Sequence, residues 1–393
     1  MARREKTQIA IIGSGPAGLM LGHLLRQAKI DVVIIERQTK EHVLSRIRAG
    51  VLEEVTTNIL EELGVADRMH AEGLPHDGFN LADGERLIRI DIAALTGKKV
   101  MVYGQTEVTR DLIEAAPSRG IDIVWSANDT ALHDVDSDAP YVTYQKDGAE
   151  HCIEARFIVG CDGFHGPSRK SIPEASSNAF EKVYPFGWLG ILADVPPCNH
   201  ELIYANHKNG FALASMRSQT RSRYYIQVPL TEKIEDWPDD RLWDELCVRL
   251  GSEAASQITR GPALEKSIAP LRSFVFEPMR HGSLFLAGDA AHIVPPTGAK
   301  GLNLAASDVA YLSRALISYF KNSDTDAIAG YSGKALARVW KSERFSWSLT
   351  TLMHRFPENG SFERRMQIAE LDYIASSKAA QHAIAENYVG LPL

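Results

Sequence analysis

The sequence predicts an α/β fold made of a Rossmann-like dinucleotide-binding domain, an inserted antiparallel-sheet domain and a helical C-terminal region. Three observations predict this fold. A glycine-rich turn separates an apolar strand from a helix near the N-terminus, residues 183–230 alternate as strands do, and residues 306–393 carry apolar positions at helical spacing. A length of 393 residues exceeds one small domain and suits a divided α/β chain.

The N-terminal unit has the element order of a dinucleotide site. Residues 9–12 form a continuous apolar run, as in a strand buried on both faces. The turn GSGPAG follows at 13–18, helical spacing continues to Leu25, and a β-branched run at 31–35 ends in Glu36. We expect a dinucleotide to bind here, the alternative being a purely structural βαβ turn.

Each residue of this motif has a physical role next to a phosphate. Gly13 permits the tight turn, Gly15 leaves room for a pyrophosphate, and Gly18 lets the helix approach the strand closely. Free amides at the helix N-terminus attract the phosphate, and Glu36 can accept hydrogen bonds from ribose hydroxyls. The motif alone does not choose between FAD and NAD. We find one such fingerprint, so a second dinucleotide would bind elsewhere.

The remaining elements follow from local patterns. In order, we expect a helix within 51–64, a strand at 100–103, a helix at 108–114, a strand at 157–160, antiparallel strands at 202–204, 211–217 and 223–228, a helix at 241–250, a strand at 283–287 and helices after 306. These patterns predict a Rossmann-like dinucleotide-binding domain at 1–178 completed by 273–305, a sheet-rich domain at 179–272, and a helical region at 306–393.

Composition excludes several functional classes. The net charge of −7 argues against nucleic-acid binding, and no apolar run approaches the roughly 20 residues that span a bilayer. The arginines at 3–4 are followed by too short an apolar run for an export signal. The four cysteines are scattered, which excludes a CxxC zinc site. We therefore expect a cytoplasmic enzyme without a metal.

A pair of predicted strands places cationic and hydroxyl side chains together. Ser215 and Arg217 are two residues apart, so they share a face of one strand, and Arg223 and Tyr225 share a face of the next. A guanidinium, a serine hydroxyl and a phenol together suit an aryl carboxylate. A surface arginine on a two-layer sheet explains the same pattern equally well.

Three segments together resemble a known family: GSGPAG with Glu36, GCDGFHGPSR at 160–169, and GDAAHIVPPTGAKGLNLA at 288–305. They are similar to those of the single-component flavin-dependent aromatic hydroxylases. The likeness continues through RIRAGVLE at 46–53, YGQTEVTRDL at 103–112 and AENYVGLP at 385–392.

The resemblance implies a tightly held FAD. The residues it implies for the ADP half are Gly13, Gly15, Ala17, Gly18 and Glu36. Those implied for the ribityl chain and ring are Arg46, Ile47, Arg48, Ala49, Gly50, Val51, Gln105, Asp162, Asp289, Leu302 and Asn303. A helix beginning near Gly301 would direct its positive end toward the ring. Arg223 and Asn303 are implied in a movement of the flavin between buried and exposed positions.

The resemblance also implies the reaction. It implies that 4-hydroxybenzoate is hydroxylated at C3 with O2, through a flavin C4a-hydroperoxide in a site that excludes water. The residues implied for substrate binding are Tyr204, Ser215, Met216, Arg217, Tyr225, Pro296 and Thr297. Tyr204, Tyr388 and His76 are implied as a chain that removes the phenol proton, with the carbonyl of Pro296 over the reacting ring. Taken alone, each tyrosine would be a core aromatic and His76 a surface histidine.

The reductant is expected to be NADPH in a surface groove. The resemblance implies contacts from Arg37, Arg48, His165 and Arg272. Lys40 would attract a 2′-phosphate and Glu41 would repel it, so NADH stays open as the alternative. The resemblance also implies that 1–178 binds FAD, that 179–272 is the substrate domain, and that the protein is a homodimer with its interface in the helical region at 306–393. Rival functions are the same chemistry on another phenolic acid, a non-hydroxylating flavin oxidoreductase, and a flavin-binding sensor.

Overall fold

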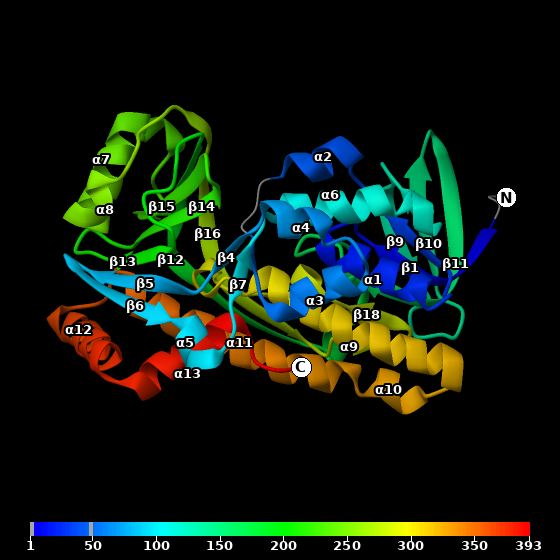
Figure 1. The fold of residues 1–393 in the computed structure, drawn as a ribbon. Helices are drawn as coiled ribbons and strands as arrows, with labels where there is room; N and C mark the ends of the chain where they lie inside the picture. Colours follow the sequence, from blue (N-terminus) through cyan, green and yellow to red (C-terminus); the bar gives the residue numbers. More distant parts are fainter. Residues whose placement is uncertain (1–3, 47–49) are drawn as a thin grey trace.

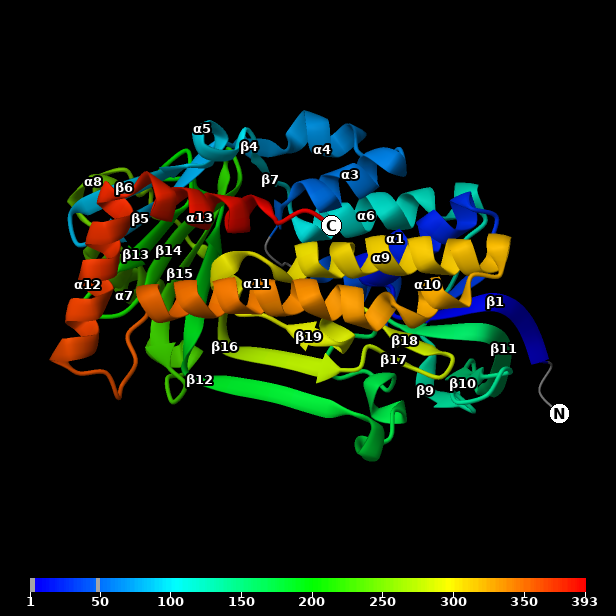
Figure 2. The same cartoon turned by 90° about the horizontal axis from the view of Figure 1, so that it is seen from below.

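The computed structural model describes residues 4–46 and 50–393, and it shows two sheets side by side with long helices along one side of both (Figures 1 and 2). The first sheet has the order β17 (Arg280–His281), β18 (Leu284–Leu286), β11 (Ala149–Gly160), β1 (Arg4–Ile12), β2 (Val32–Ile35) and β8 (Asp122–Val124). Strands β10 (Tyr141–Lys146) and β9 (Asn128–His133) extend it from β11.

The core of the first sheet is parallel, as the continuous apolar runs predict. Strand β1 lies between β2 and β11, with Ile9 opposite Val32 on one side and Phe157 on the other. Helix α1 (Pro16–Gln27) connects β1 to β2 and packs against helix α9 (Gly301–Asn322). The Rossmann-like expectation is therefore confirmed.

The second sheet has the order β19 (His292–Ile293), β16 (Ala263–Glu277), β12 (Asn178–Ala193), β15 (Arg221–Pro229), β14 (Ala212–Ser218), β13 (Ile203–Asn206), β5 (Gly78–Asp83) and β6 (Arg86–Asp91). Strands β12 and β16 are long and antiparallel, and they run from the first half of the molecule to the second (Figure 2). Segment 78–91 joins this sheet through a parallel pairing of β5 with β13, although the expected boundary placed it with the FAD-binding part.

The two faces of the second sheet have different neighbours. One face packs under α7 (Asp239–Leu250) and α8 (Ser252–Ser256) through an apolar cluster that contains Tyr224 and Trp243. The other face turns toward the rest of the molecule, where its apolar residues join those of α11 (Tyr331–Met353), α12 (Ser361–Ser376) and α13 (Lys378–Val389). A binding site on that second face is enclosed by protein.

Shorter elements complete the fold around the two large sheets. A small sheet has the order β3 (Val51–Leu52), β7 (Val100–Val102) and β4 (Leu74–His76). The accompanying helices are α2 (Lys40–Ser45), α3 (Glu54–Glu62), α4 (Asp67–Glu72), α5 (Ile92–Thr96), α6 (Gln105–Ala115) and α10 (Thr325–Ala329). None of the helices within the described ranges has the length and apolar character needed to cross a bilayer.

Candidate active site

The residues expected around FAD gather at one edge of the first sheet. Gly13 follows β1, Glu36 follows β2, Asp162 follows β11, and Asp289 lies in the turn after β18. These four strands are neighbours and run parallel, so their carboxyl ends meet at one edge. In open α/β sheets this edge is where ligands bind.

The glycine turn has the geometry that a pyrophosphate requires. Gly13 has φ +102°, and an added Cβ would lie 2.4 Å from the carbonyl oxygen of Cys161. A Cβ on Gly18 would lie 2.1 Å from the oxygen of Gly13, whereas one on Gly15 would meet nothing within 4 Å. The turn is therefore tightly packed at Gly13 and Gly18 and open at Gly15. Gly15 is also the N-cap of α1, so Ala17 and the first amides of the helix follow this open position.

Glu36 closes the turn from the adjacent strand. Its Oε2 accepts hydrogen bonds from the amide (2.8 Å) and hydroxyl (2.9 Å) of Ser14, and its Oε1 accepts one from the amide of Gln38 (2.8 Å). The side chain is buried at the end of β2. A carboxylate held in place this way can receive ribose hydroxyls without losing rotamer freedom on binding.

We expect the substitution Glu36→Ala to weaken FAD binding by roughly 10- to 100-fold, because a hydrogen bond to a charged group contributes about 1.5–3 kcal/mol. The measurement is the fraction of flavin fluorescence released on dilution of the purified protein. Asp31→Ala, which removes an exposed acid just before β2, is the matched control and should retain FAD. Equal retention by both variants would contradict the assignment of Glu36.

The region expected at the flavin ring is built from three separate segments. Gly50 and Val51 lie against β7, and a Cβ on Gly50 would lie 1.9 Å from the oxygen of Tyr103. Gln105 begins α6, next to the hydroxyl of Thr106, which donates to the carbonyl of Arg46 (2.8 Å). Helix α9 begins at Gly301, followed by Leu302 and Asn303, as expected. Ile47, Arg48 and Ala49 lie outside the described residues.

Two of the residues expected at the cofactor have partners within the protein. Asn303 donates to the carbonyls of Val51 (2.8 Å) and Ala299 (2.9 Å) and accepts from the amide of Glu53 (2.9 Å), so it joins the start of α9 to β3. Arg223 is buried in the second sheet, where Nη1 lies 3.0 Å from Glu265 and Nη2 donates to Ser267 (3.0 Å). Their expected role in flavin movement stays a prediction.

An ion-pair cluster at the start of α9 was not predicted from the sequence. The buried Lys300 ammonium lies 2.6 Å from Glu53 and donates to the carbonyl of Tyr388 (3.0 Å). Arg338 reaches the other oxygen of Glu53 at 3.3 Å. Burial lowers the pKa of Lys300, and the carboxylate of Glu53 opposes that shift. The cluster joins the C-terminal segment to the flavin end of the site. Local sequence patterns do not predict a contact between residues so far apart.

The expected substrate residues lie on one face of the second sheet. Tyr204 on β13 is directly opposite Leu213 on β14, which is opposite Tyr225 on β15. Two residues further along β14, Ser215 lies opposite Arg223. Since side chains alternate between faces, these residues share one side, and Arg217 stays on it because its Nη1 lies 3.4 Å from the hydroxyl of Ser215.

Arg217 has unused hydrogen-bonding capacity. Its Nη1 donates to the carbonyl of Met216 (3.0 Å), and within the described chain its buried Nε has no partner. Burial lowers the pKa of Arg217, and the neighbouring Tyr225 opposes that shift. The pairing of β14 with β15 is also irregular here, with a register shift between Met216 and Ser218. A half-buried guanidinium without an acidic partner among the described residues suits an anionic ligand.

Tyr204 and Tyr388 form a buried pair, although 184 positions separate them. Their hydroxyl oxygens lie 3.0 Å apart, and Phe79 stacks on Tyr388 with ring centroids 4.1 Å apart. Burial raises the pKa of Tyr204 to about 12, an effect that the hydrogen bond with Tyr388 partly offsets. Burial also raises the pKa of Tyr388. Both phenols therefore stay protonated at neutral pH and can pass a proton between them.

His76 is buried at the end of β4, and its described polar contact differs from the expected one. Its Nε2 lies 3.1 Å from the sulfur of Met216, and its buried Nδ1 has no partner among the described residues. Burial lowers the pKa of His76, so the imidazole is neutral at pH 7. A contact with the tyrosine pair stays a prediction. The contact with Met216 brings two of the expected residues together.

The proline turn follows β19 and leads into α9. Pro296 is exposed at the start of a short 3₁₀ turn, Pro296–Gly298, and Thr297 is fully buried. The hydroxyl of Thr297 lies 2.9 Å from that of Thr350 on α11, so this helix contacts the turn directly.

Two of the residues expected to contact the nicotinamide cofactor share an aromatic neighbour. The guanidinium of Arg272 lies 4.6 Å from the centre of the Phe164 ring, and His165 is in edge contact with the same ring. Arg272 also lies 3.2 Å from Glu181. Arg37 is exposed directly after Glu36, and Arg48 lies outside the described residues.

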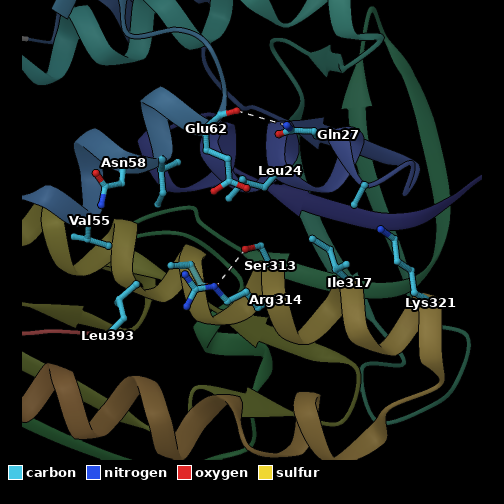
Figure 3. Close-up of a pocket in the computed structure, with 13 residues that line it drawn as sticks. Leu24, Gln27, Val55, Asn58, Glu62, Ser313, Arg314, Ile317, Lys321 and Leu393 are labelled. Atoms are coloured by element: carbon cyan, nitrogen blue, oxygen red, sulfur yellow. Dashed lines mark hydrogen bonds between the residues drawn. The ribbon is translucent and has the colours of Figure 1, made fainter. Parts of the chain in front are cut away.

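A cavity of about 340 Å³ lies away from these residues (Figure 3). It opens between α3 and the C-terminal halves of α1 and α9, with Gln27, Glu62 and Arg314 among its polar lining residues. Since the glycine turn is at the opposite end of α1, this cavity is separate from the cofactor edge.

Comparison with known proteins identifies the class. Residues 6–346 match the model of the FAD binding domain family, so the chain belongs to that family. Within it, the chain is 56% identical over 388 residues to p-hydroxybenzoate hydroxylase from Acinetobacter baylyi, covering 98% of this chain and 96% of that protein. Rifampicin monooxygenase from Rhodococcus hoagii is 26% identical, covering 86% of this chain and 68% of that protein.

Solved structures show the same fold. The crystal structure of p-nitrophenol 4-monooxygenase from Pseudomonas putida has a TM-score of 0.83 and 17% sequence identity, covering 99% of this chain and all of that one. The resemblance to flavin-dependent aromatic hydroxylases inferred from the three sequence segments is confirmed.

Proposed function

We propose that the protein is an FAD-dependent monooxygenase that hydroxylates 4-hydroxybenzoate at C3 to 3,4-dihydroxybenzoate, using O2 and NADPH. The observation that carries this proposal is the placement of Arg217 and Tyr204 on one face of the same sheet. The strong similarity to p-hydroxybenzoate hydroxylase supports the choice of substrate.

The carboxylate of the substrate would bind at the Arg217 end of this face. Arg217 supplies the charge and the planar donors, with the hydroxyls of Ser215 and Tyr225 beside it. Leu213 lies opposite Tyr204, and the four residues of strand from there to Arg217 rise by roughly 13 Å. That separation suits one aromatic ring with hydrogen bonds at both ends.

The phenol end of the substrate would lie at the tyrosine pair. Tyr204 hydrogen-bonds the substrate hydroxyl and relays its proton to Tyr388, 3.0 Å away, while the proton of Tyr388 passes on through His76 toward solvent. The resulting phenolate is more electron-rich at the carbon next to the hydroxyl than the neutral phenol is. Because both tyrosines stay protonated at neutral pH, Tyr204 can donate a hydrogen bond to the phenolate while Tyr388 donates one to Tyr204.

FAD fits the edge formed by Gly13, Gly15, Glu36, Asp162 and Asp289, and when reduced it supplies the activation of O2. The chain's own contribution around it is to exclude water. Apolar residues of β5, β14, α11 and α13 join the tyrosine pair in one buried cluster. A dry surrounding favours transfer of oxygen to the ring over loss of hydrogen peroxide.

The absorbance spectrum of the purified protein tests the proposal. A flavin spectrum that changes on titration with 4-hydroxybenzoate, followed by formation of 3,4-dihydroxybenzoate with NADPH and air, is expected. A flavin spectrum unaffected by 4-hydroxybenzoate would refute the substrate assignment.

We expect a higher kcat/KM with NADPH than with NADH, because Lys40 and the exposed Arg37 lie close to Glu36, where a 2′-phosphate would be attracted. Steady-state rates with both reductants at low ionic strength measure the ratio. Arg37→Ala should reduce it by about 5-fold, as one surface charge is worth up to about 1 kcal/mol. A preference for NADH in the unmodified protein would contradict this part of the proposal.

A cytoplasmic location and a homodimer are also proposed. Exposed aromatic side chains on α11 and α12, including Trp347 (45% exposed) and Phe362 (68% exposed), would become buried against a second copy. Light scattering coupled to size-exclusion chromatography should report twice the chain mass.

A further inference from the structure

A buried carboxyl group lies on α11, the helix that contacts the proline turn, and it has no part in the chemistry described so far. Glu343, on α11, is 5% exposed. Neither of its carboxyl oxygens, both buried, has a hydrogen-bond partner within 4–46 and 50–393. Buried carboxyl groups are normally paired, so one without a partner calls for an explanation.

Glu343 begins a buried polar stripe on α11. Ser346 and Thr350 continue it at intervals of three and four residues, which places all three on one side of the helix, and the buried His354 follows directly after the helix. Among described residues the hydroxyl of Ser346 also lacks a partner. A helix face that is both buried and polar is unusual, because burial normally selects apolar residues.

This stripe faces the turn expected to lie over the substrate ring. A Cβ on Gly298 would lie 2.5 Å from the hydroxyl of Ser346, and Thr350 contacts Thr297 at 2.9 Å. Helix α11 therefore holds the Pro296–Gly298 turn through small polar side chains on the same face as Glu343.

Several ionisable groups surround Glu343. His292 on β19 faces it and pairs with Asp308 of α9 at 2.6 Å, and Tyr184 on β12 lies beyond Ser273, with their hydroxyl oxygens 3.2 Å apart. Lys182 lies over the ring of Tyr184. Burial raises the pKa of Glu343 to about 7, against the effects of Ser273 and His292.

We propose that Glu343 is a positioning residue of the substrate site, whose neutral carboxyl lets α11 hold the Pro296–Gly298 turn in place and whose ionisation loosens it. An unpaired charge on Glu343, buried between α11 and its neighbours, would draw in water and separate α11 from the turn. The role acts through the turn, so Glu343 need not touch substrate or cofactor.

Stability should fall as the pH rises, because the folded protein holds Glu343 in its neutral form. The unfolded chain ionises Glu343 near its ordinary pKa of 4.5, while the folded protein keeps it protonated to about pH 7. Stability from this group is therefore complete below pH 4.5 and is lost as the pH rises through 7. A variant with the neutral side chain of Gln at this position would keep this stability at high pH.

The first test is thermal unfolding of the FAD-loaded protein. Relative to the unmodified protein, Glu343→Gln should raise the Tm by several degrees more at pH 8.5 than at pH 5. Glu370→Gln, which removes an exposed acid on α12, should give the same difference at both pH values. The same difference at both pH values for Glu343→Gln would overturn the proposal.

The second test is ligand binding, which rests on the proposed function for its choice of ligand. A benzoate without the phenol hydroxyl removes the phenol's own ionisation from the titration. For the unmodified protein its Kd, from the flavin absorbance change, should rise about 3- to 10-fold between pH 6 and 8.5, whereas Glu343→Gln should show a constant Kd.

Two arms of this test separate the possible origins of the pH effect. Burial lowers the pKa of His76, which moves its ionisation away from the range between pH 6 and 8.5, whereas the pKa of His292, beside Asp308, is raised toward that range. A His292→Gln variant should still show the rise in Kd with pH. If the Kd of this variant did not rise, the proposal would be overturned. If Glu343→Gln does not hold FAD, an unchanged Kd of the unmodified protein at both pH values overturns it. Failure of the benzoate to bind at all would refute the proposed function and leave the unfolding test to decide on Glu343.

Discussion

Replacing Arg217 with alanine is expected to abolish the binding of 4-hydroxybenzoate while FAD stays bound. The Kd should rise by at least about 100-fold, because loss of a buried, charge-assisted pair costs about 3 kcal/mol or more. FAD should be retained because Arg217 lies in the second sheet, whereas the glycine turn and Glu36, which are expected to hold the ADP half, lie at the edge of the first. Titration of the flavin absorbance with 4-hydroxybenzoate measures the effect.

Two further variants give this experiment its specificity. Arg217→Lys keeps the charge but loses the planar pair of donors, so an intermediate Kd is expected. Arg221→Ala removes an exposed arginine on β15 that pairs with Asp194, and it should bind the substrate normally. Normal affinity in Arg217→Ala would remove the carboxylate assignment.

The substitution Tyr204→Phe is expected to leave flavin reduction by NADPH intact and to separate it from hydroxylation. Without the hydroxyl, the substrate keeps its proton more often and the ring is a poorer nucleophile. A positioned acid or base contributes about 100- to 10,000-fold, so most of the oxygen consumed should end as hydrogen peroxide. The ratio of 3,4-dihydroxybenzoate formed to NADPH consumed measures the effect.

Other tyrosines provide the comparisons. Tyr388→Phe should act in the same direction, because it removes the second member of the hydroxyl pair. Tyr373 is 54% exposed on α12, and Tyr373→Phe should give the same product yield as the unmodified protein. Full product yield from Tyr204→Phe would exclude a role for this hydroxyl in activating the phenol.

The sequence predicts the cofactor half of the fold well because its signals are local. The strand ending at Ile12, the turn through Gly18 and the acid at Glu36 lie within one short stretch, and the structure has β1, α1 and β2 there. The side-chain alternation of Ser215 and Arg217 is equally local, and their contact at 3.4 Å confirms the shared face.

Long-range contacts could not be predicted from local pattern. The parallel pairing of β5 with β13 joins residues that are far apart in the sequence, and no periodicity specifies such a pair. The same is true of Lys300 with Glu53 and of His292 with Asp308. Tyr388 was identified only through the resemblance to a family, since a single tyrosine on a helix is ordinarily a core residue.

Cavity volume alone would have led to a different site. The cavity in Figure 3 lies at the far ends of α1 and α9, whereas the substrate face is recognised by the chemistry of its side chains. The informative features are a half-buried arginine that has no acidic partner among the described residues and a buried pair of phenols.

The most direct measurement is a crystal structure of the protein with FAD and 4-hydroxybenzoate. The account predicts the substrate carboxylate within hydrogen-bond distance of the Arg217 guanidinium and the phenol oxygen within hydrogen-bond distance of the Tyr204 hydroxyl. A substrate bound in the reverse orientation, or at a place that touches neither residue, would contradict it.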